Sequence, residues 1–314
     1  MAQILITTDY LCPGDHVDLL LRQQGHQTIY SPYTGARDSL DRQTLFEGID
    51  GAILASEPVS ADMLIGADQL RVLSRSGVGY DSIDVAAASS LGVRVCNAPG
   101  TNHHSVAEMT IGLLIATARR LTAVSGAVNS GAWPREAGHE LHGSTLGVVG
   151  YGPSGRAVAR IGVAMGMTVL VSTSHPEPED SFVDFASFDT VVEQADYLSL
   201  HTRPDPVQPI LINEQRLHAM KSTGVLINTA RGSLIDEWAL ADALRHGRIA
   251  AAALDVLDRE PLSDQSPLWG LEDLLITSHL AGQTIEARAR AGVVAAQAVI
   301  DVLDGRDPVH QVNP

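Results

Sequence analysis

Short apolar runs and polar stretches alternate along the first hundred residues. Segments with helical spacing, 15–24 and 82–91, lie between runs that are rich in β-branched residues and end at turn residues or loops, as strands do. These runs are 3–8 (QILITT), 51–55 (GAILA), 71–76 (RVLSRS) and 93–98 (VRVCNA). The alternation predicts a small parallel α/β domain.

A second alternating series begins with the apolar run TLGVVG at 145–150. Further strands are predicted near 168–172, 196–200, 224–228, 250–255 and 274–277. Before this series, residues 102–128 form one long helical pattern with Glu108 near its start and Arg119 and Arg120 towards its end, which suits the helix dipole. From about residue 285 an alanine-rich helical pattern runs to Gly305.

This order of elements predicts two parallel-sheet domains. We place one domain in residues 1–99 joined by 285–314, and an inserted nucleotide-binding domain in residues 100–284. A length of 314 residues agrees with two domains, because single hydrophobic cores stop growing near about 250–300 residues.

Composition and charge exclude several classes of protein. The formal net charge of −16, with no basic stripe, argues against nucleic acid and anionic membrane surfaces as partners. No stretch reaches about 18 uninterrupted apolar residues, so we expect no membrane span. Cys12 and Cys96 form no disulfide framework, and the chain enters a strand without a charged leader, so we expect a soluble, cytoplasmic protein.

A glycine-rich motif follows the first strand of the second series. GYGPSG has the spacing GxGxxG, and apolar residues recur at helical spacing after it. In a dinucleotide-binding turn, Gly150 would allow the tight turn, Gly152 would let the backbone approach a diphosphate, and Gly155 would let the helix pack on the strand. Pro153 and Ser154 would open the helix, where a missing N–H costs little.

The end of the next strand lacks the residue that usually reads an NAD ribose. An Asp or Glu stands there in most NAD-binding units, about 20 residues beyond the glycines. This chain has Ser172, Thr173, Ser174 and His175 instead. A carboxylate would repel the 2′-phosphate of NADP, whereas hydroxyls do not, so NAD and NADP both remain open.

Three charged residues each follow a predicted strand of the second series. Arg231 lies in INTARGSLIDE, Glu260 in AALDVLDREP and His279 in ITSHLAG. Ligands bind beyond the carboxyl ends of the strands in open parallel sheets, so these side chains are expected to converge there. Taken singly, each has a structural alternative, as a surface charge, a loop residue or a helix cap.

The chain resembles the D-isomer-specific 2-hydroxyacid dehydrogenases over nearly its full length. The motifs GVVGYGPSG, LINTARGSLIDEWALADAL, AAALDVLDREPL, SHLAG and SGVGYDSIDVAAASSLGVRVCNAPG are close to that family's signatures. WPREAGHELHGSTLG resembles the phosphoglycerate dehydrogenase branch. The resemblance implies a flavodoxin-like substrate domain carrying a Rossmann NAD(P)-binding domain, and reversible oxidation of a small D-2-hydroxy acid.

The resemblance also implies roles for individual residues. His279 would exchange the hydroxyl proton, Glu260 would bind its other ring nitrogen, and Arg231 would hold the substrate carboxylate and carbonyl; Arg231 pairing only with Glu260 is the alternative. Asp255 would accept a bond from the nicotinamide carboxamide or act as a buried cap. Further implied contacts are Gly77, Val78, Gly79 and His279 for the substrate, and Thr173, Ser174, His175, His201, Thr202, Arg203, Thr229, Ala230, His279 and Gly282 for the cofactor.

Differences between this sequence and the family's usual motifs bear on the identity of the cofactor and of the substrate. STSH resembles the loop of NADP-using members, and Arg203 adds a cation, so we expect NAD or NADP with NADP slightly favoured. Ala55 and Ser56 stand where the phosphoglycerate branch has an arginine, and Glu57 follows them. We therefore expect an unphosphorylated 2-oxo acid such as glyoxylate or hydroxypyruvate.

Three expectations concern other classes of site and partner. NAD(H)-sensing corepressors share the architecture and are the alternative function, but no peptide-accepting cleft is identifiable. HELH (139–142) lacks a third ligand, so no metal is expected. The apolar run MTIGLLIATA (109–118) and Trp133 predict a homodimer, since family members pair through this region.

Overall fold

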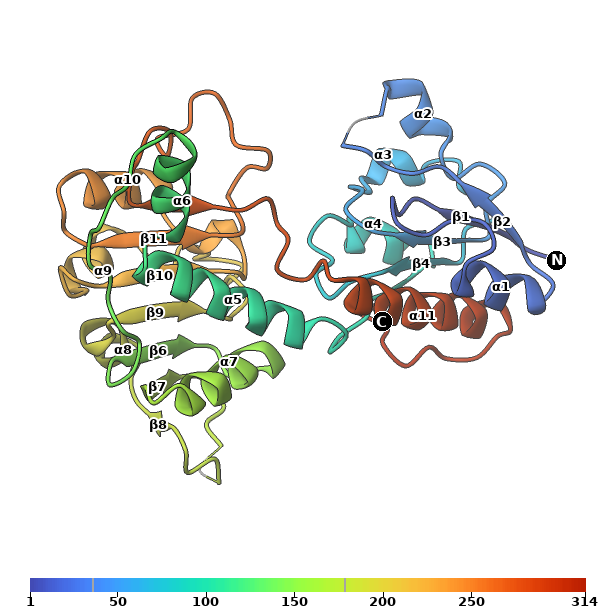
Figure 1. The fold of residues 1–314 in the computed structure, drawn as a ribbon. Helices are drawn as coiled ribbons and strands as arrows, with labels where there is room; N and C mark the ends of the chain where they lie inside the picture. Colours follow the sequence, from blue (N-terminus) through green and yellow to red (C-terminus); the bar gives the residue numbers. More distant parts are fainter. Residues whose placement is uncertain (36, 178) are drawn as a thin grey trace. The chain divides into compact units, whose positions relative to one another are not determined.

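The computed structural model describes residues 1–35, 37–177 and 179–314, which fall into two compact units. The first unit comprises Met1–Asn102 and Gln283–Pro314, and the second comprises His103–Gly282. Each unit is built on a parallel sheet covered by helices (Figure 1). The two parallel-sheet α/β domains predicted from the sequence are therefore confirmed.

Within the described residues of the first unit, five strands form a sheet in the order β2-β1-β3-β4-β5. Its strands are β1 (Gln3–Ile6), β2 (Gln27–Tyr30), β3 (Gly51–Leu54), β4 (Val72–Arg75) and β5 (Arg94–Cys96). Its helices are α1 (His16–Gln23), α2 (Ser39–Thr44), α3 (Ala61–Leu64), α4 (Val85–Ser90) and α11 (Ile285–Leu303). The sequence did not predict the edge strand β2, whose residues alternate between exposed and partly buried.

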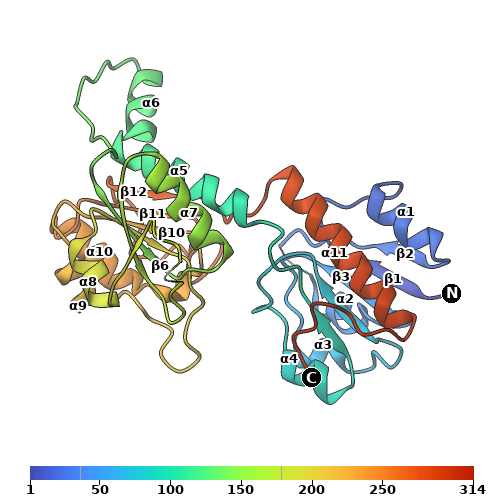
Figure 2. The same ribbon diagram turned by 90° about the horizontal axis from the view of Figure 1, so that it is seen from below.

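Both faces of the central strands β1, β3 and β4 are buried. Ile4 and Ile6 pack into a cluster with α11, whereas Leu5 points to the opposite cluster, because side chains alternate across a strand. The alanine-rich sequence of α11 suits its place along the sheet (Figure 2). Small side chains let it approach closely, and a Cβ on Gly292 would lie 3.0 Å from a methyl of Val17.

In the part of the second unit that the structure describes, seven strands form a sheet in the order β12-β11-β10-β9-β6-β7-β8. They are β6 (Thr145–Val149), β7 (Thr168–Ser172), β8 (Asp184–Phe185), β9 (Tyr197–Leu200), β10 (Val225–Asn228), β11 (Ala251–Leu254) and β12 (Leu274–Ile276). The sequence did not predict the two-residue strand β8. The strand order reverses at β6, which has β9 on one side and β7 on the other; ligands bind at such a switch point in open parallel sheets.

Helices cover both faces of the second sheet. They are α5 (His103–Ala118), α6 (Leu121–Asn129), α7 (Pro153–Ala164), α8 (Phe188–Gln194), α9 (Glu214–Ala219) and α10 (Glu237–Arg245), with a short 3₁₀ turn at Gly232–Leu234. Helices α5 and α7 lie side by side on one face (Figure 1). Helices α8, α9 and α10 pack on the other face, so helices lie on both faces, as is usual for parallel sheets.

The predicted continuous helix over 102–128 is wrong, because α5 ends at Ala118 and α6 starts at Leu121 after a bend of 63°. The carbonyl of Ala118 accepts the N–H of His139, which closes the helix end. Arg120 takes a left-handed backbone conformation with φ 49° and forms ion pairs with Glu136 and Asp273. These partners lie far along the chain, so local periodicity could not locate the break.

No single helix among the described residues is long and apolar enough to cross a membrane. In the same part of the chain, only the bent pair α5–α6 reaches that length and composition, and α5 buries seven of its residues within the unit.

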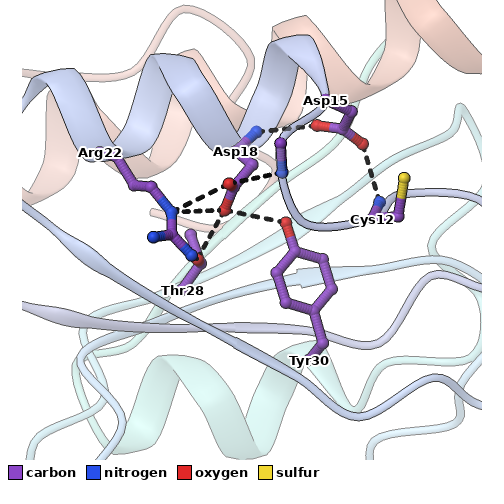
Figure 3. Close-up of polar contacts among 7 residues, drawn as sticks. Cys12, Asp15, Asp18, Arg22, Thr28 and Tyr30 are labelled. Carbon is purple, nitrogen blue, oxygen red and sulfur yellow. Dashed lines mark hydrogen bonds and ion pairs between the residues drawn. The ribbon is translucent and has the colours of Figure 1, made fainter.

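A buried carboxylate joins α1 to β2 in the first unit (Figure 3). Asp18 accepts hydrogen bonds from Arg22 Nε (2.9 Å), Thr28 Oγ1 (2.6 Å), Tyr30 Oη (3.1 Å) and the N–H of Gly14 (2.8 Å). Burial alone would raise the pKa of Asp18, but these four donors together lower it to about 2. The ionised form is therefore bound more tightly in the folded state than in the unfolded one.

Asp18→Asn should lower the free energy of unfolding at neutral pH by about 2 kcal/mol, the amount linked to a pKa depression of this size. A depressed carboxyl pKa stabilises above the unfolded-state value, and the stabilisation is lost as pH falls through the folded-state value. The difference between wild type and variant in urea unfolding should therefore shrink between about pH 4 and pH 2. Asp62→Asn, an exposed first-turn acid of α3, is the control. A difference independent of pH would contradict this account.

Candidate active site

The glycine turn joins β6 to α7 with three different spatial requirements. Gly150 has φ 96°, and a Cβ there would lie 2.4 Å from the carbonyl oxygen of His201. A Cβ on Gly155 would lie 2.1 Å from the carbonyl oxygen of Gly150. Around a Cβ on Gly152, by contrast, no heavy atom of the described residues, apart from the glycine and its chain neighbours, comes within 4 Å. The turn therefore packs tightly at its ends and leaves open space at its middle glycine.

The start of α7 offers hydrogen-bond donors into this space. Helix α7 begins at Pro153 and has no side-chain cap. No described residue accepts a hydrogen bond from the N–H of Ser154 or Gly155. Free N–H groups at a helix start attract anions. The residues present thus fit the diphosphate of a dinucleotide.

The turn after β7 contains hydroxyls and an imidazole in place of a carboxylate. Thr173 Oγ1 accepts the N–H of His175 at 3.2 Å, and Ser174 Oγ lies 2.9 Å from His175 Nδ1. Further along, Glu177 forms an ion pair with Arg156 of α7. The loop after β7 is therefore tied to the helix that follows the glycine turn.

His201, directly after β9, lies against the glycine turn. Its Nε2 lies 2.8 Å from Ser199 Oγ. Burial lowers the pKa of His201 to about 4, so the ring is neutral near pH 7. The neighbouring Thr202 is partly buried, and the side chain of Arg203 is exposed.

The turn after β10 is shaped by Asn228, which the sequence analysis did not single out. Its side chain accepts the N–H of Ala230 at 3.0 Å and donates to the carbonyl of Arg231 at 2.8 Å. Thr229 is buried, with its hydroxyl 3.0 Å from that of Thr110. Arg231 Nη1 donates to the carbonyl of Ala230 at 2.7 Å.

Glu260 and His279 are in direct contact. His279 Nδ1 lies 2.8 Å from Glu260 Oε2, and Glu260 Oε1 accepts the N–H of Leu257 at 3.0 Å. Burial would raise the pKa of Glu260, but these two hydrogen bonds and the charges of His279 and Arg231 hold it below its usual value. The carboxylate is therefore ionised near pH 7, accepts the Nδ1 proton and leaves Nε2 for exchange with a ligand.

Asp255 holds the turn that carries His279. It is 1% exposed, and its carboxylate accepts hydrogen bonds from Thr277 Oγ1 (2.6 Å) and from the N–H groups of Leu280 and Ala281 (both 2.8 Å). His279 itself has φ 58°, a conformation that few non-glycine residues adopt. With these contacts Asp255 acts as a buried cap of the turn. A hydrogen bond from a nicotinamide carboxamide to Asp255 stays a prediction. Gly282 is the last residue of the second unit.

In the first unit, the Gly77–Gly79 loop has all three of its carbonyls engaged. They accept hydrogen bonds from Ala98 N–H (2.8 Å), Asn97 Nδ2 (2.7 Å) and Arg75 Nε (2.9 Å) respectively. No described residue accepts from the N–H of Val78 or Gly79. A loop with fixed peptide planes and two such donors suits a carboxylate.

The charge expected at Glu57 is not available to a ligand, so that part of the sequence analysis is wrong. Glu57 is 1% exposed and forms a bidentate ion pair with Arg37. Two further N–H groups of Arg37, one on Nη1 and one on Nη2, donate to the hydroxyl and the carbonyl of Ser31. The partners are 20 residues apart in the sequence, and no local pattern marks such a pair.

Lys221 and Asp196 lie at the amino ends of the strands, away from this arrangement. Lys221, the one lysine of the sequence, forms an ion pair at 2.7 Å with Asp196, which also accepts the N–H of Thr145 at the amino end of β6. Among the described residues, no group of three or more His, Cys, Asp or Glu side chains could hold a metal ion.

Comparisons with known proteins identify relatives of this chain. A family model described as D-isomer specific 2-hydroxyacid dehydrogenase, NAD binding domain, matches residues 111–281. D-3-phosphoglycerate dehydrogenase of Mycobacterium leprae is 37% identical over 285 residues, which are 88% of this chain and 54% of that protein. This chain thus spans about half the length of that relative.

Two further relatives match over most of their own length. Glyoxylate reductase of Aeropyrum pernix is 36% identical over 272 residues, covering 83% of this chain and 81% of that protein. The crystal structure of the TT0316 protein from Thermus thermophilus superimposes with a TM-score of 0.90 and 35% identity, covering 99% of each chain.

Gly152→Ala tests whether the open space at the glycine turn receives a dinucleotide. The backbone of Gly152 has φ −72°, which alanine adopts freely, so the variant should fold with an unchanged melting temperature. The added methyl would crowd a diphosphate at the helix start, and the dissociation constants of NADH and NADPH should rise about tenfold, equivalent to about 1.4 kcal/mol. Fluorescence titration measures this, with Gly112→Ala in α5 as control. Unchanged affinity for both would place the diphosphate elsewhere.

Proposed function

Since the chain belongs to the D-isomer specific 2-hydroxyacid dehydrogenase family, we propose that it is an NAD(P)-dependent oxidoreductase that interconverts a small D-2-hydroxy acid and its 2-oxo acid. The observation that carries the proposal is the hydrogen bond between His279 and Glu260. It lies at the same sheet edge as an open glycine turn, because every strand involved is parallel.

The proposed mechanism assigns one task to each side chain. The nicotinamide, when bound, supplies or accepts the hydride at the substrate's second carbon. His279 Nε2 gives a proton to the carbonyl oxygen in reduction and removes it from the hydroxyl in oxidation. Glu260, bound to Nδ1, fixes the ring tautomer and stabilises the imidazolium form. Arg231 binds the substrate carboxylate and polarises the carbonyl.

For the substrate we propose an unphosphorylated 2-oxo acid, such as glyoxylate or hydroxypyruvate. Ala55 and Ser56 carry no charge, and the charge of Arg37 is compensated by its ion pair with Glu57, with further bonds to Ser31. The name of the Aeropyrum pernix relative supports the same substrate class. The N–H groups of Val78 and Gly79 are proposed to bind the substrate carboxylate.

A homodimer is proposed on the exposed apolar residues of the second unit. None of the residues of α6 is buried, and Leu121 and Val128 are 49% and 40% exposed. Trp133, in the loop after α6, is 80% exposed. Figure 2 shows this helix and loop projecting from the unit. A self-complementary interface would remove these side chains from water.

The alternative of an NAD(H)-sensing binding protein receives no comparable support. The relatives whose names state an activity are a dehydrogenase and a reductase. A proton-exchanging pair such as Glu260 and His279 serves turnover, and a protein that only senses the dinucleotide does not need one.

His279→Ala should lower kcat at least about 100-fold, the usual contribution of a general acid–base group, while either reduced dinucleotide still binds. The measurement is the steady-state rate with glyoxylate or hydroxypyruvate, together with a fluorescence titration of the dinucleotide. His246→Ala, an exposed histidine at the end of α10, is the matched control and should retain the wild-type rate. Near-normal turnover of His279→Ala would remove His279 from the mechanism.

Thr173→Asp should raise the ratio of kcat/KM for NADH to that for NADPH by about tenfold, which corresponds to about 1.4 kcal/mol. The new carboxylate would accept ribose hydroxyls and repel a 2′-phosphate. Ser181→Asp places the same charge on an exposed position of the same loop and should leave the ratio unchanged. If the ratio does not move in Thr173→Asp, residue 173 does not face the ribose.

A further inference from the structure

The loop that carries Glu260 has a second anchor, provided by α10. The N–H of Asp258 donates to Glu237 Oε1 at 2.9 Å. Glu237 is the first residue of α10, but the helix is already capped, since Asp236 accepts from the N–H groups of Trp238 and Ala239. The carboxylate of Glu237 is therefore free of the capping role and turned to the loop.

The same loop also packs against a glycine. A Cβ on Gly232 would lie 1.8 Å from the carbonyl carbon of Leu257 and 2.2 Å from the nitrogen of Asp258. The backbone of Gly232 is thus in direct contact with the peptide between Leu257 and Asp258. Gly232 and Glu237 belong to one segment, which begins at Arg231. The segment that carries the proposed substrate-binding arginine therefore holds Leu257 and Asp258 at two points.

Leu257 in turn fixes the carboxylate of Glu260. Its N–H binds Oε1 at 3.0 Å, while Oε2 contacts His279. A shift of the Leu257 peptide would displace the carboxylate from the imidazole. Misplacements of about 1 Å from a change outside the reacting groups can cost about 100-fold in rate.

We propose that Glu237 is a positioning residue for the Glu260–His279 pair, acting through the N–H of Asp258 and the peptide of Leu257. The inference rests on the proposed roles of Glu260 and His279. Glu237 itself touches neither of them and exchanges no proton. Its carboxylate keeps the loop in contact with Gly232. The positions of Arg231 and Glu260 relative to each other are thereby maintained.

Three substitutions separate this role from a general contribution to stability. Glu237→Ala removes the acceptor, and Glu237→Asp keeps the charge at the start of α10 but shortens the side chain by one methylene. Glu237→Gln keeps both length and acceptor. Glu214→Ala, which removes the exposed first-turn acid of α9, is the matched control.

We expect kcat to fall about tenfold or more in Glu237→Ala and Glu237→Asp, with KM for the dinucleotide unchanged. Glu237→Gln and Glu214→Ala should retain the wild-type kcat. Weakening the Leu257 hydrogen bond removes one of the contacts that lower the pKa of Glu260. The acid limb of the pH–rate profile should therefore move to higher pH in the Ala and Asp variants only.

A titration of glutamate carboxyl carbons by ¹³C NMR gives a readout without turnover, with the Glu260 signal assigned through Glu260→Gln. The Glu260 midpoint should rise in Glu237→Ala and Glu237→Asp and stay in place in Glu237→Gln. A Glu260 midpoint that is the same in all variants would overturn the inference, as would Glu237→Gln behaving like Glu237→Ala. Failure of wild type to reduce any 2-oxo acid would instead overturn the proposed function, and the titration would still decide the role of Glu237.

Discussion

The proposed chemistry of the second unit depends on how the carboxylate of Glu260 is held in place. One oxygen receives the N–H of Leu257 and the other receives the imidazole of His279. These hydrogen bonds, with the charge of Arg231, overcome the effect of burial and keep the carboxylate ionised. An ionised carboxylate stabilises a protonated imidazole, which is the state a proton donor needs. Displacing this one group would leave His279 without its partner.

The parallel sheet explains why such distant residues meet. The turns after β10, β11 and β12 carry Arg231, Asp255 and His279, and all strands point the same way. Asp255 binds the turn of His279 through three hydrogen bonds. In the same way, the buried Asn228 binds the turn of Arg231. Both buried side chains make these bonds because an unpaired buried donor or acceptor costs about 1–3 kcal/mol.

Periodicity and turn residues predicted most strands, the glycine turn and the placing of Arg231, Glu260 and His279 after strands, because these features are local. The sequence did not predict features that depend on distant partners. The break after Ala118 requires His139, the neutralisation of Glu57 requires Arg37, and the carboxylate of Asp18 requires β2. The capping role of Asp255 was foreseen as an alternative, yet only the contacts with residues 277–281 reveal how it is made.

The most direct test of the account is the steady-state oxidation of NADH and NADPH with glyoxylate, hydroxypyruvate and phosphorylated 2-oxo acids as substrates. The account predicts turnover of at least one unphosphorylated 2-oxo acid, with a D-2-hydroxy acid as product and a higher kcat/KM than for the phosphorylated compounds. Tight binding of a dinucleotide without turnover of any 2-oxo acid would contradict it, and would favour a protein that senses the cofactor.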